Sequence, residues 1–471
     1  MKFSERDIQE YIWENQSDWG SLIGNLDLPK AYEFSHDLLN LTPEYLLHNL
    51  AIKRIQEIYE LISELKFLGC EVPLNRTDQS TIRADFIALS SQRDRMIIVE
   101  LKKSAQTERQ SFTELLAYSN HLKITFPGMS REDIVYVLIA PMQTRIVKEA
   151  FIQTLVFDKR PIFAFVPEFS DENDISTLRL TPWIPTINEM ISFTQTTFHP
   201  CNLDVVKVCW EYSEDFWDPP KGEQIKDYQV GQLNSVSSLA AQVMEQKGIN
   251  GFAYCSQIWP ELSSNLPYTN SLVVVGINPY SVTSKMYSIE HDKEDKPSEY
   301  YTQFVPDMSE IISGLNNLNF NAENPLEQLQ RGWKSQIFDL AFQTAKFATR
   351  TIEREMFLEH SSMTWGEYQQ LFFEDGCCAN FAARPTGVIR ELFWEVVSLD
   401  YGFAEQAATE NFPENADMYF NSIETLDDNG IFRKFIQRMF GGDPNLKFRS
   451  IFDVFKPTAT LEDDNTDELP W

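Results

Sequence analysis

The chain has 471 residues, 43% hydrophobic and 13% aromatic, which indicates a folded protein of several domains and argues against disorder. It has no apolar run of roughly 18 residues, and its first residues resemble no signal peptide, so we expect a cytoplasmic protein without a membrane segment. The six cysteines include no C-x-x-C pair or zinc-type spacing, which argues against a disulfide framework and a structural zinc. The net charge of −30 would repel nucleic acid at long range, yet residues 51–180 are nearly neutral, with 17 basic against 18 acidic side chains.

Two helices are predicted first along the chain. Residues 4–16 carry a helix-start signal, Ser4 followed by Asp7, and residues 46–69 predict a second helix that ends at Gly69. The pattern then changes to short β-branched or aliphatic segments bounded by turn-forming residues, which predict strands. These segments are residues 70–75, 81–90, 95–103 and 133–141.

A further helix is predicted over residues 107–123, and residues 145–169 predict a helix followed by a strand. The resulting order, α, α, β, β, β, α, β, α, β, predicts an α/β domain over residues 1–175. Residues 170–186 are polar and punctuated by proline, which indicates a linker.

The rest of the chain is predicted to form three further parts. Residues 181–300 predict a smaller α/β unit, with strands in "LDVVKVCWEY" and "SLVVVGINPY" around a helix in "LNSVSSLAAQVMEQ". Residues 301–457 predict a mainly helical region, because apolar residues recur there at spacings of three and four. Residues 458–471 form an acidic tail without periodicity.

A charged triplet at the end of an apolar strand is the main candidate site. The segments "RADFIAL" and "IIVEL" predict the arms of a hairpin, and with the loop centred between Gln92 and Arg93, Asp85 lies directly across from Glu100. Strand alternation then places Lys102 on the same face as Glu100. Two opposed carboxylates repel each other unless a cation lies between them.

These residue types suit metal-assisted hydrolysis of a phosphodiester bond. Carboxylate oxygens hold Mg²⁺, the ion polarises the phosphate and lowers the pKa of a bound water, and an ammonium steadies the developing charge. The alternative interpretation is a surface ion pair, since E-x-K triplets are common. The apolar residues on both arms favour the catalytic interpretation, because unpaired charges in a buried hairpin are costly.

The hairpin and the helix after it resemble the PD-(D/E)xK nuclease superfamily, and residues 1–175 are similar to the nuclease domain of NucS-type DNA endonucleases. The resemblance implies a restriction-endonuclease-like fold. It also implies that Asp85 and Glu100 bind Mg²⁺, with Mn²⁺ as a substitute, and that Lys102 orients the attacking water or stabilises the transition state.

Supporting residues follow from the same resemblance. The superfamily's Gln-x-x-x-Tyr element falls on Glu114 and Tyr118, so a glutamate replaces the glutamine, and Ala84 stands where proline is frequent. The superfamily also draws an acid from a preceding helix, and Glu5 suits the NucS-like pattern. Three other acids lie closer to the strands: Glu57, Glu60 and Glu64.

Basic residues and the tail suggest partners. Lys103, Arg109 and Lys123 are candidates for contacts with DNA phosphates, although a solvated helix surface explains them equally well. The end "EDDNTDELPW" resembles the C-terminal tip of bacterial single-stranded-DNA-binding proteins, which implies a docking peptide for a protein partner. An ordinary solubilising terminus and a plug that lies over the nuclease groove of the same chain are the alternatives.

Two functions remain open on the sequence. The first is a Mg²⁺-dependent DNA endonuclease or nickase in genome defence, such as antiviral defence, or in DNA repair. The second is a catalytically silent nuclease-fold protein that binds other proteins through its acidic surface and tail. We also expect a homo-oligomer.

Overall fold

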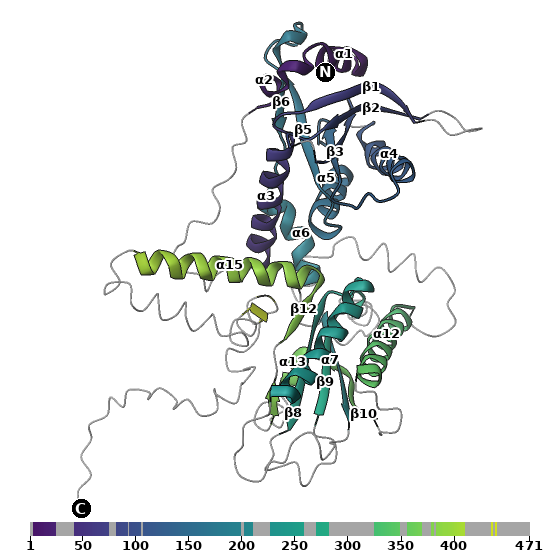
Figure 1. The fold of residues 1–471 in the computed structure, drawn as a ribbon, viewed down its shortest axis with the longest axis vertical. Helices are drawn as coiled ribbons and strands as arrows, with labels where there is room; N and C mark the ends of the chain where they lie inside the picture. Colours follow the sequence, from purple (N-terminus) through teal and green to yellow (C-terminus); the bar gives the residue numbers. More distant parts are fainter. Residues whose placement is uncertain are drawn as a thin grey trace, which may run out of the picture. The chain divides into compact units, whose positions relative to one another are not determined.

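The computed structural model describes residues 3–24, 42–74, 82–92, 94–104, 107–198, 202–210, 227–258, 270–281, 325–348, 356–369, 378–380, 383–409, 435, 436 and 439. The chain divides into two compact units, Met1–Ser35 with Glu44–Ile191, and His36–Pro43 with Ser192–Trp471. Both contain helices and a sheet (Figure 1), as the sequence predicts for residues 1–175 and 181–300. The acidic tail lies outside the described residues. Within the described ranges, every helix is too short or too polar to cross a lipid bilayer.

The first unit is built on a mixed six-stranded sheet in the order β1-β2-β3-β4-β5-β6. Its strands are β1 (Lys66–Leu74), β2 (Ile82–Leu89), β3 (Met96–Leu101), β4 (Ile134–Ile139), β5 (Ile162–Phe169) and β6 (Leu178–Pro182). The three central strands β3, β4 and β5 are parallel, and all other pairs are antiparallel. Every residue of β4 is buried, as expected for a parallel strand covered on both faces.

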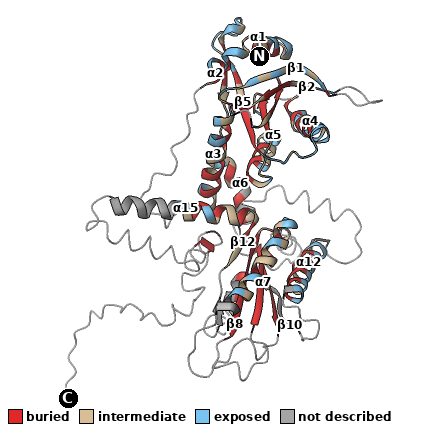
Figure 2. Ribbon diagram, viewed as in Figure 1, coloured by how far each residue is buried: buried red, intermediate tan, exposed pale blue. Residues whose placement is uncertain are grey.

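Helices surround this sheet (Figure 1). They are α1 (Glu5–Glu14), α2 (Trp19–Leu22), α3 (Pro43–Ile62), α4 (Ser111–Thr125), α5 (Arg145–Ile152) and α6 (Ile187–Thr197), with short turns η1 (Gln16–Asp18), η3 (Glu108–Gln110), η4 (Gln153–Phe157) and η5 (Ile175–Thr177). Helix α1 begins as predicted, because the side chains of Ser4 and Asp7 each accept a hydrogen bond from the other residue's backbone N–H. Figure 2 shows buried residues concentrated in the strands and along one side of α3.

Gly69 does not end the second helix, so that prediction is wrong. Helix α3 ends at Ile62, and Gly69 lies inside β1, where the pairing with β2 shifts between Phe67 and Gly69. A glycine within a strand commonly marks a bulge. A Cβ at this position would lie 2.7 Å from a methyl group of Val72.

The segment predicted as a linker contains strand β6. This strand pairs antiparallel with β5 at the edge of the sheet, so the sheet continues beyond residue 175. Leu178 and Leu180 are fully buried while Arg179 is exposed, which is the alternation of a half-buried edge strand. Pro182 is tolerated because it lies at the end of an edge strand.

The second unit contains an antiparallel sheet in the order β10-β7-β9-β8-β11, and β12 also pairs with β8. Its strands are β7 (Leu203–Trp210), β8 (Gly251–Ile258), β9 (Asn270–Ile277), β10 (Met356–Thr364), β11 (Cys378–Asn380) and β12 (Arg384–Thr386). Its helices are α7 (Asp227–Gln246), α12 (Pro325–Ala348), α13 (Trp365–Gln369) and α15 (Gly387–Thr409). Helices α7 and α12 pack on one face of the sheet around a common core.

This sheet joins segments that the sequence assigns to two domains. Strands β7, β8 and β9 come from residues 181–300, whereas β10, β11 and β12 come from the region predicted as a separate helical domain, residues 301–457. Helices α12 and α15 do lie in that region, as the spacing of apolar residues predicts. The boundary near residue 300 therefore does not separate two sheets.

Candidate functional site

The hairpin of β2 and β3 opens at the end that carries the predicted site. Phe86 pairs with Val99, which is the register that the sequence predicts, and the backbone ladder stops at this pair. Beyond it, the backbone N–H of Leu101 donates to Asp85 Oδ2 at 2.7 Å. A side-chain carboxylate thus replaces a backbone acceptor, which leaves the carboxylates of Asp85 and Glu100 beside an opening between two strands.

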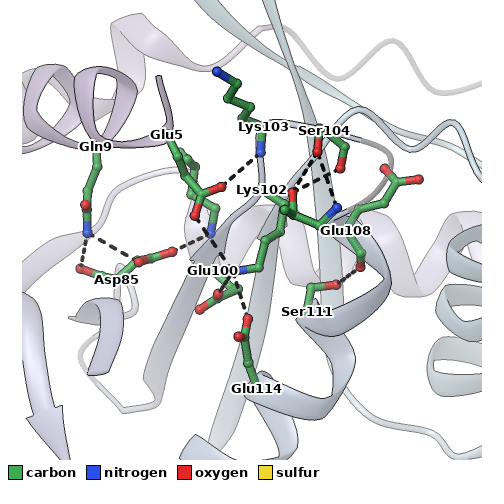
Figure 3. Close-up of polar contacts among 12 residues, drawn as sticks. Glu5, Gln9, Asp85, Glu100, Lys102, Lys103, Ser104, Glu108, Ser111 and Glu114 are labelled. Carbon is green, nitrogen blue, oxygen red and sulfur yellow. Dashed lines mark hydrogen bonds and ion pairs between the residues drawn. The ribbon is translucent and has the colours of Figure 1, made fainter. Parts of the chain in front are cut away.

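Lys102 lies among three carboxylates at this opening (Figure 3). Its ammonium donates to Glu100 Oε1 and lies 2.7 Å from Glu114 Oε2 and 3.9 Å from Glu5 Oε1. Glu100 is only 1% exposed and Lys102 7%. The charges that the sequence places on one strand face are therefore buried and held by a helix on each side, α1 for Glu5 and α4 for Glu114.

Burial dominates the acid–base properties of the two strand carboxylates. It raises the pKa of Asp85 to about 6, which the Leu101 N–H partly offsets, and it raises the pKa of Glu100 to about 9 with a further contribution from the charge of Asp85. Burial alone would lower the pKa of Lys102, but the negative charges of Glu100 and Glu114 outweigh it and raise the pKa. Lys102 is therefore a cation at neutral pH.

Both α4 residues suggested by the resemblance lie at this site. Burial alone would raise the pKa of Glu114, but its contacts with Glu100 and Lys102 lower it, so it stays ionised. Tyr118 lies one turn further along α4 and is buried, and its pKa is raised first by burial and then by the charge of Glu100. Glu5 joins from α1, so the structure brings together Asp85, Glu100, Lys102, Glu114, Tyr118 and Glu5.

Asp85 and Glu100 are the candidate ligands for a divalent cation at this site. Glu100 Oε2 is buried and accepts no hydrogen bond of good geometry, which leaves it available to a water or an ion. Within the described residues, no three His, Cys, Asp or Glu side chains are grouped to hold a metal ion. An ion at this site would be held by the two carboxylates of Asp85 and Glu100, with water as its other ligands, a mode of binding that Mg²⁺ accepts.

Glu60 lies away from this site. Its backbone carbonyl accepts a hydrogen bond from Ser91 Oγ at 3.0 Å, and Ser91 belongs to the loop at the opposite end of the hairpin. Glu57 lines a polar surface cavity beside the same loop. Glu57 and Glu60 thus lie at the other end of the hairpin, whereas Glu5 lies at the site.

The three predicted phosphate contacts are scattered. The backbone N–H of Lys103 donates to Glu5 Oε2 at 3.3 Å, while its side chain points away from the carboxylates (Figure 3). Arg109 is exposed in η3. Lys123 lies near the end of α4, about 14 Å along the helix axis from Glu114.

Two residues at or near the site are not predicted from the sequence. Gln9 Nε2 lies 3.4 Å from both Asp85 Oδ1 and the Asp85 carbonyl oxygen, and its position four residues after Glu5 was the available signal. Glu108 is 0% exposed, and its Oε1 accepts a hydrogen bond from the N–H of Thr144 at 2.8 Å. Nothing in the local sequence distinguishes Glu108 from a surface glutamate.

The site therefore combines two buried strand carboxylates, a buried lysine and an acid from each of two helices, at the point where the strand pairing opens. Its chemistry is inferred from these residues alone. Comparisons of the chain with protein-family models, with curated proteins and with solved structures found no match.

Proposed function

We propose that the chain is a divalent-cation-dependent nuclease that hydrolyses phosphodiester bonds in DNA as an endonuclease or nickase, in genome defence or DNA repair. The observation that carries the proposal is the burial of Glu100 with an unpartnered Oε2, next to Asp85 and Lys102. The strand order and the resemblance to the PD-(D/E)xK superfamily support a restriction-endonuclease-like fold for the first unit.

In this proposal Asp85 and Glu100 hold Mg²⁺ or Mn²⁺. When bound, the ion supplies a polarised phosphate and a water of lowered pKa. Lys102 remains protonated because its pKa is raised, so it stabilises negative charge that develops on the phosphate and does not act as a base. Glu114 and Glu5 hold the ammonium in place.

A second candidate is a catalytically silent protein that keeps the nuclease scaffold and binds other proteins through its acidic surface. It is favoured by the net charge of −30. It is also favoured by the ion pairs of Lys102 with Glu100 and Glu114, which neutralise the buried carboxylates without a metal ion. This candidate predicts neither cleavage of DNA nor binding of a divalent cation.

Cleavage assays on supercoiled plasmid and single-stranded DNA, with Mg²⁺, Mn²⁺ or EDTA, test the proposal. We expect metal-dependent cleavage by the wild-type chain that is abolished by Asp85→Ala and by Lys102→Ala. Lys66→Ala is the matched control, because Lys66 is an exposed residue of β1. Cleavage that survives both substitutions, or that proceeds in EDTA, would place the activity elsewhere.

A further inference from the structure

Helix α1 bridges the opening between β2 and β3. Glu5 and Gln9 lie four residues apart and therefore on one face of the helix. Glu5 contacts the two residues that follow β3, through the N–H of Lys103 and the ammonium of Lys102, whereas Gln9 contacts β2 through Asp85. One helix face thus contacts β2 and the residues just after β3, at the point where the two strands no longer pair with each other.

The helix is firmly anchored in this position. Ile8 and Ile12 are fully buried, and the ring of Trp13 stacks on Phe86 with centroids 6.5 Å apart. The hydroxyl group of Tyr11 donates to a backbone carbonyl beyond β5, that of Ser176, at 3.3 Å. Because these contacts fix the backbone of α1, the amide group of Gln9 is presented to Asp85 from a rigid support.

Gln9 restrains the part of the Asp85 carboxylate that the hairpin leaves free. Asp85 Oδ2 is held by the N–H of Leu101, and Oδ1 faces Gln9 Nε2 at 3.4 Å. Two donors from different elements define the plane of a carboxylate better than one, since a single bond allows rotation about the side-chain torsion. Gln9 is 7% exposed, and a buried amide is costly without partners, which accounts for its orientation toward Asp85.

We propose that Gln9 is a positioning residue that orients the Asp85 carboxylate for binding of a divalent cation. This inference rests on the proposed function, because it requires an ion at Asp85. Loss of a partner that orients a metal ligand lowers metal affinity about 10- to 100-fold. We therefore expect removal of the Gln9 amide to weaken cation binding by about tenfold or more.

The experiment measures binding of Mn²⁺ to the metal-free full-length chain by isothermal titration calorimetry. Gln9→Ala removes the amide, and Gln9→Met removes it while preserving the length of the side chain, so that packing of α1 is retained. Gln56→Ala is the matched control, because Gln56 is an exposed glutamine on another helix, α3. Asp85→Ala identifies the binding event that belongs to this site. Thermal unfolding verifies that each variant is folded.

Weaker Mn²⁺ binding by Gln9→Met, with Gln56→Ala equal to the wild type, would support the proposal. A positioning role also predicts that DNA cleavage by Gln9→Met requires more Mn²⁺ while the KM for DNA stays unchanged. Equal Mn²⁺ affinity of Gln9→Met and the wild type would overturn the role of Gln9 and leave the proposed nuclease intact. If Asp85→Ala binds Mn²⁺ as the wild type does, or if the wild type binds none, both the role of Gln9 and the proposed nuclease would be overturned.

Discussion

The ammonium of Lys102 lies 2.7 Å from Glu114 Oε2, so a carboxylate of α4 holds the lysine at the end of β3. A glutamine side chain also offers an acceptor oxygen, but it lacks the charge. Because the lysine is charged, a bond to either acceptor falls in the range of about 1.5–3 kcal/mol, and the carboxylate adds a Coulombic attraction that solvent screens, since Glu114 is partly exposed. The identity of residue 114 therefore sets how tightly the lysine is held.

We expect Glu114→Gln to retain a rate of DNA cleavage within about tenfold of the wild type and Glu114→Ala to lose about 10- to 100-fold in this rate. Single-turnover cleavage at saturating Mn²⁺ measures both. Glu132→Ala is the control, because Glu132 is an exposed residue in the turn before β4. Equal rates for the alanine and glutamine variants would show that residue 114 does not hold the lysine during catalysis.

The buried carboxylate of Glu100 should make the metal-free protein less stable as the pH rises. Its pKa in the folded state, about 9, exceeds that of an unfolded glutamate, so its contribution to stability is complete below about pH 4.3 and is lost as the pH rises towards 9. Glu100→Gln cannot titrate. We therefore measure the free energy of unfolding by urea, in EDTA, from pH 5 to pH 8. It should fall less steeply with pH in Glu100→Gln than in the wild type, and the two slopes should differ by at most about 1.4 kcal/mol per pH unit.

Addition of MnCl₂ at pH 8 should stabilise the wild type and leave Glu100→Gln nearly unchanged. Glu14→Gln serves as the control for both measurements, because Glu14 is exposed at the end of α1. Parallel pH profiles for Glu100→Gln and the wild type would contradict the assignment of this pH dependence to Glu100.

Glu108 should matter for stability rather than chemistry. It connects the starts of two helices, since its Oε1 accepts from the N–H of Thr144 before α5 and its carbonyl accepts from Ser111 Oγ at 2.6 Å in α4. Glu108→Ala leaves a buried N–H without a partner, which costs about 1–3 kcal/mol, in addition to the cavity. Glu108→Gln keeps the acceptor oxygen and should cost less than about 1 kcal/mol. Urea unfolding measures both, and equal losses would contradict the hydrogen-bond explanation.

Gly387 fixes the start of α15 in the second unit. Its φ is +60°, and a Cβ there would lie 2.0 Å from Asn250 Oδ1, which accepts the N–H of Val388. We expect Gly387→Ala to lower the free energy of unfolding by at least about 1–2 kcal/mol. Gly332→Ala, in the middle of α12 with open space around the new methyl group, should instead add up to about 1 kcal/mol. Thermal unfolding of the two variants should thus shift in opposite directions.

Local sequence signals predicted the first unit well where the contacts are local. The hairpin register follows from alternation and a short loop, and Phe86 and Val99 pair as expected. The sequence does not show which role Gly69 has, because glycine is common both at helix ends and in β-bulges. Only the pairing of β1 with β2 identifies it as part of a bulge. Strand β6 has only a Leu-Arg-Leu alternation, which is too short to outweigh the prolines around it.

The second unit was harder to predict because its sheet is assembled from distant segments. Strand β11 and strand β12 have three residues each, so they show no periodicity, and they become strands only by pairing with β8. At the candidate site, the charged residues of the strand were visible in the sequence. The sequence alone does not single out Glu5 among the acids of the preceding helices, because its contact with Lys103 spans 98 positions.

The bridge made by α1 has a consequence for how the protein folds. Its contacts join Gln9 to Asp85 across 76 positions and Glu5 to Lys103 across 98, so the site cannot form until the chain has been synthesised at least to Lys103 and has closed a long loop. Contacts of such high sequence separation slow folding. Binding of a metal ion at Asp85 would therefore report that α1 has docked on the end of the hairpin.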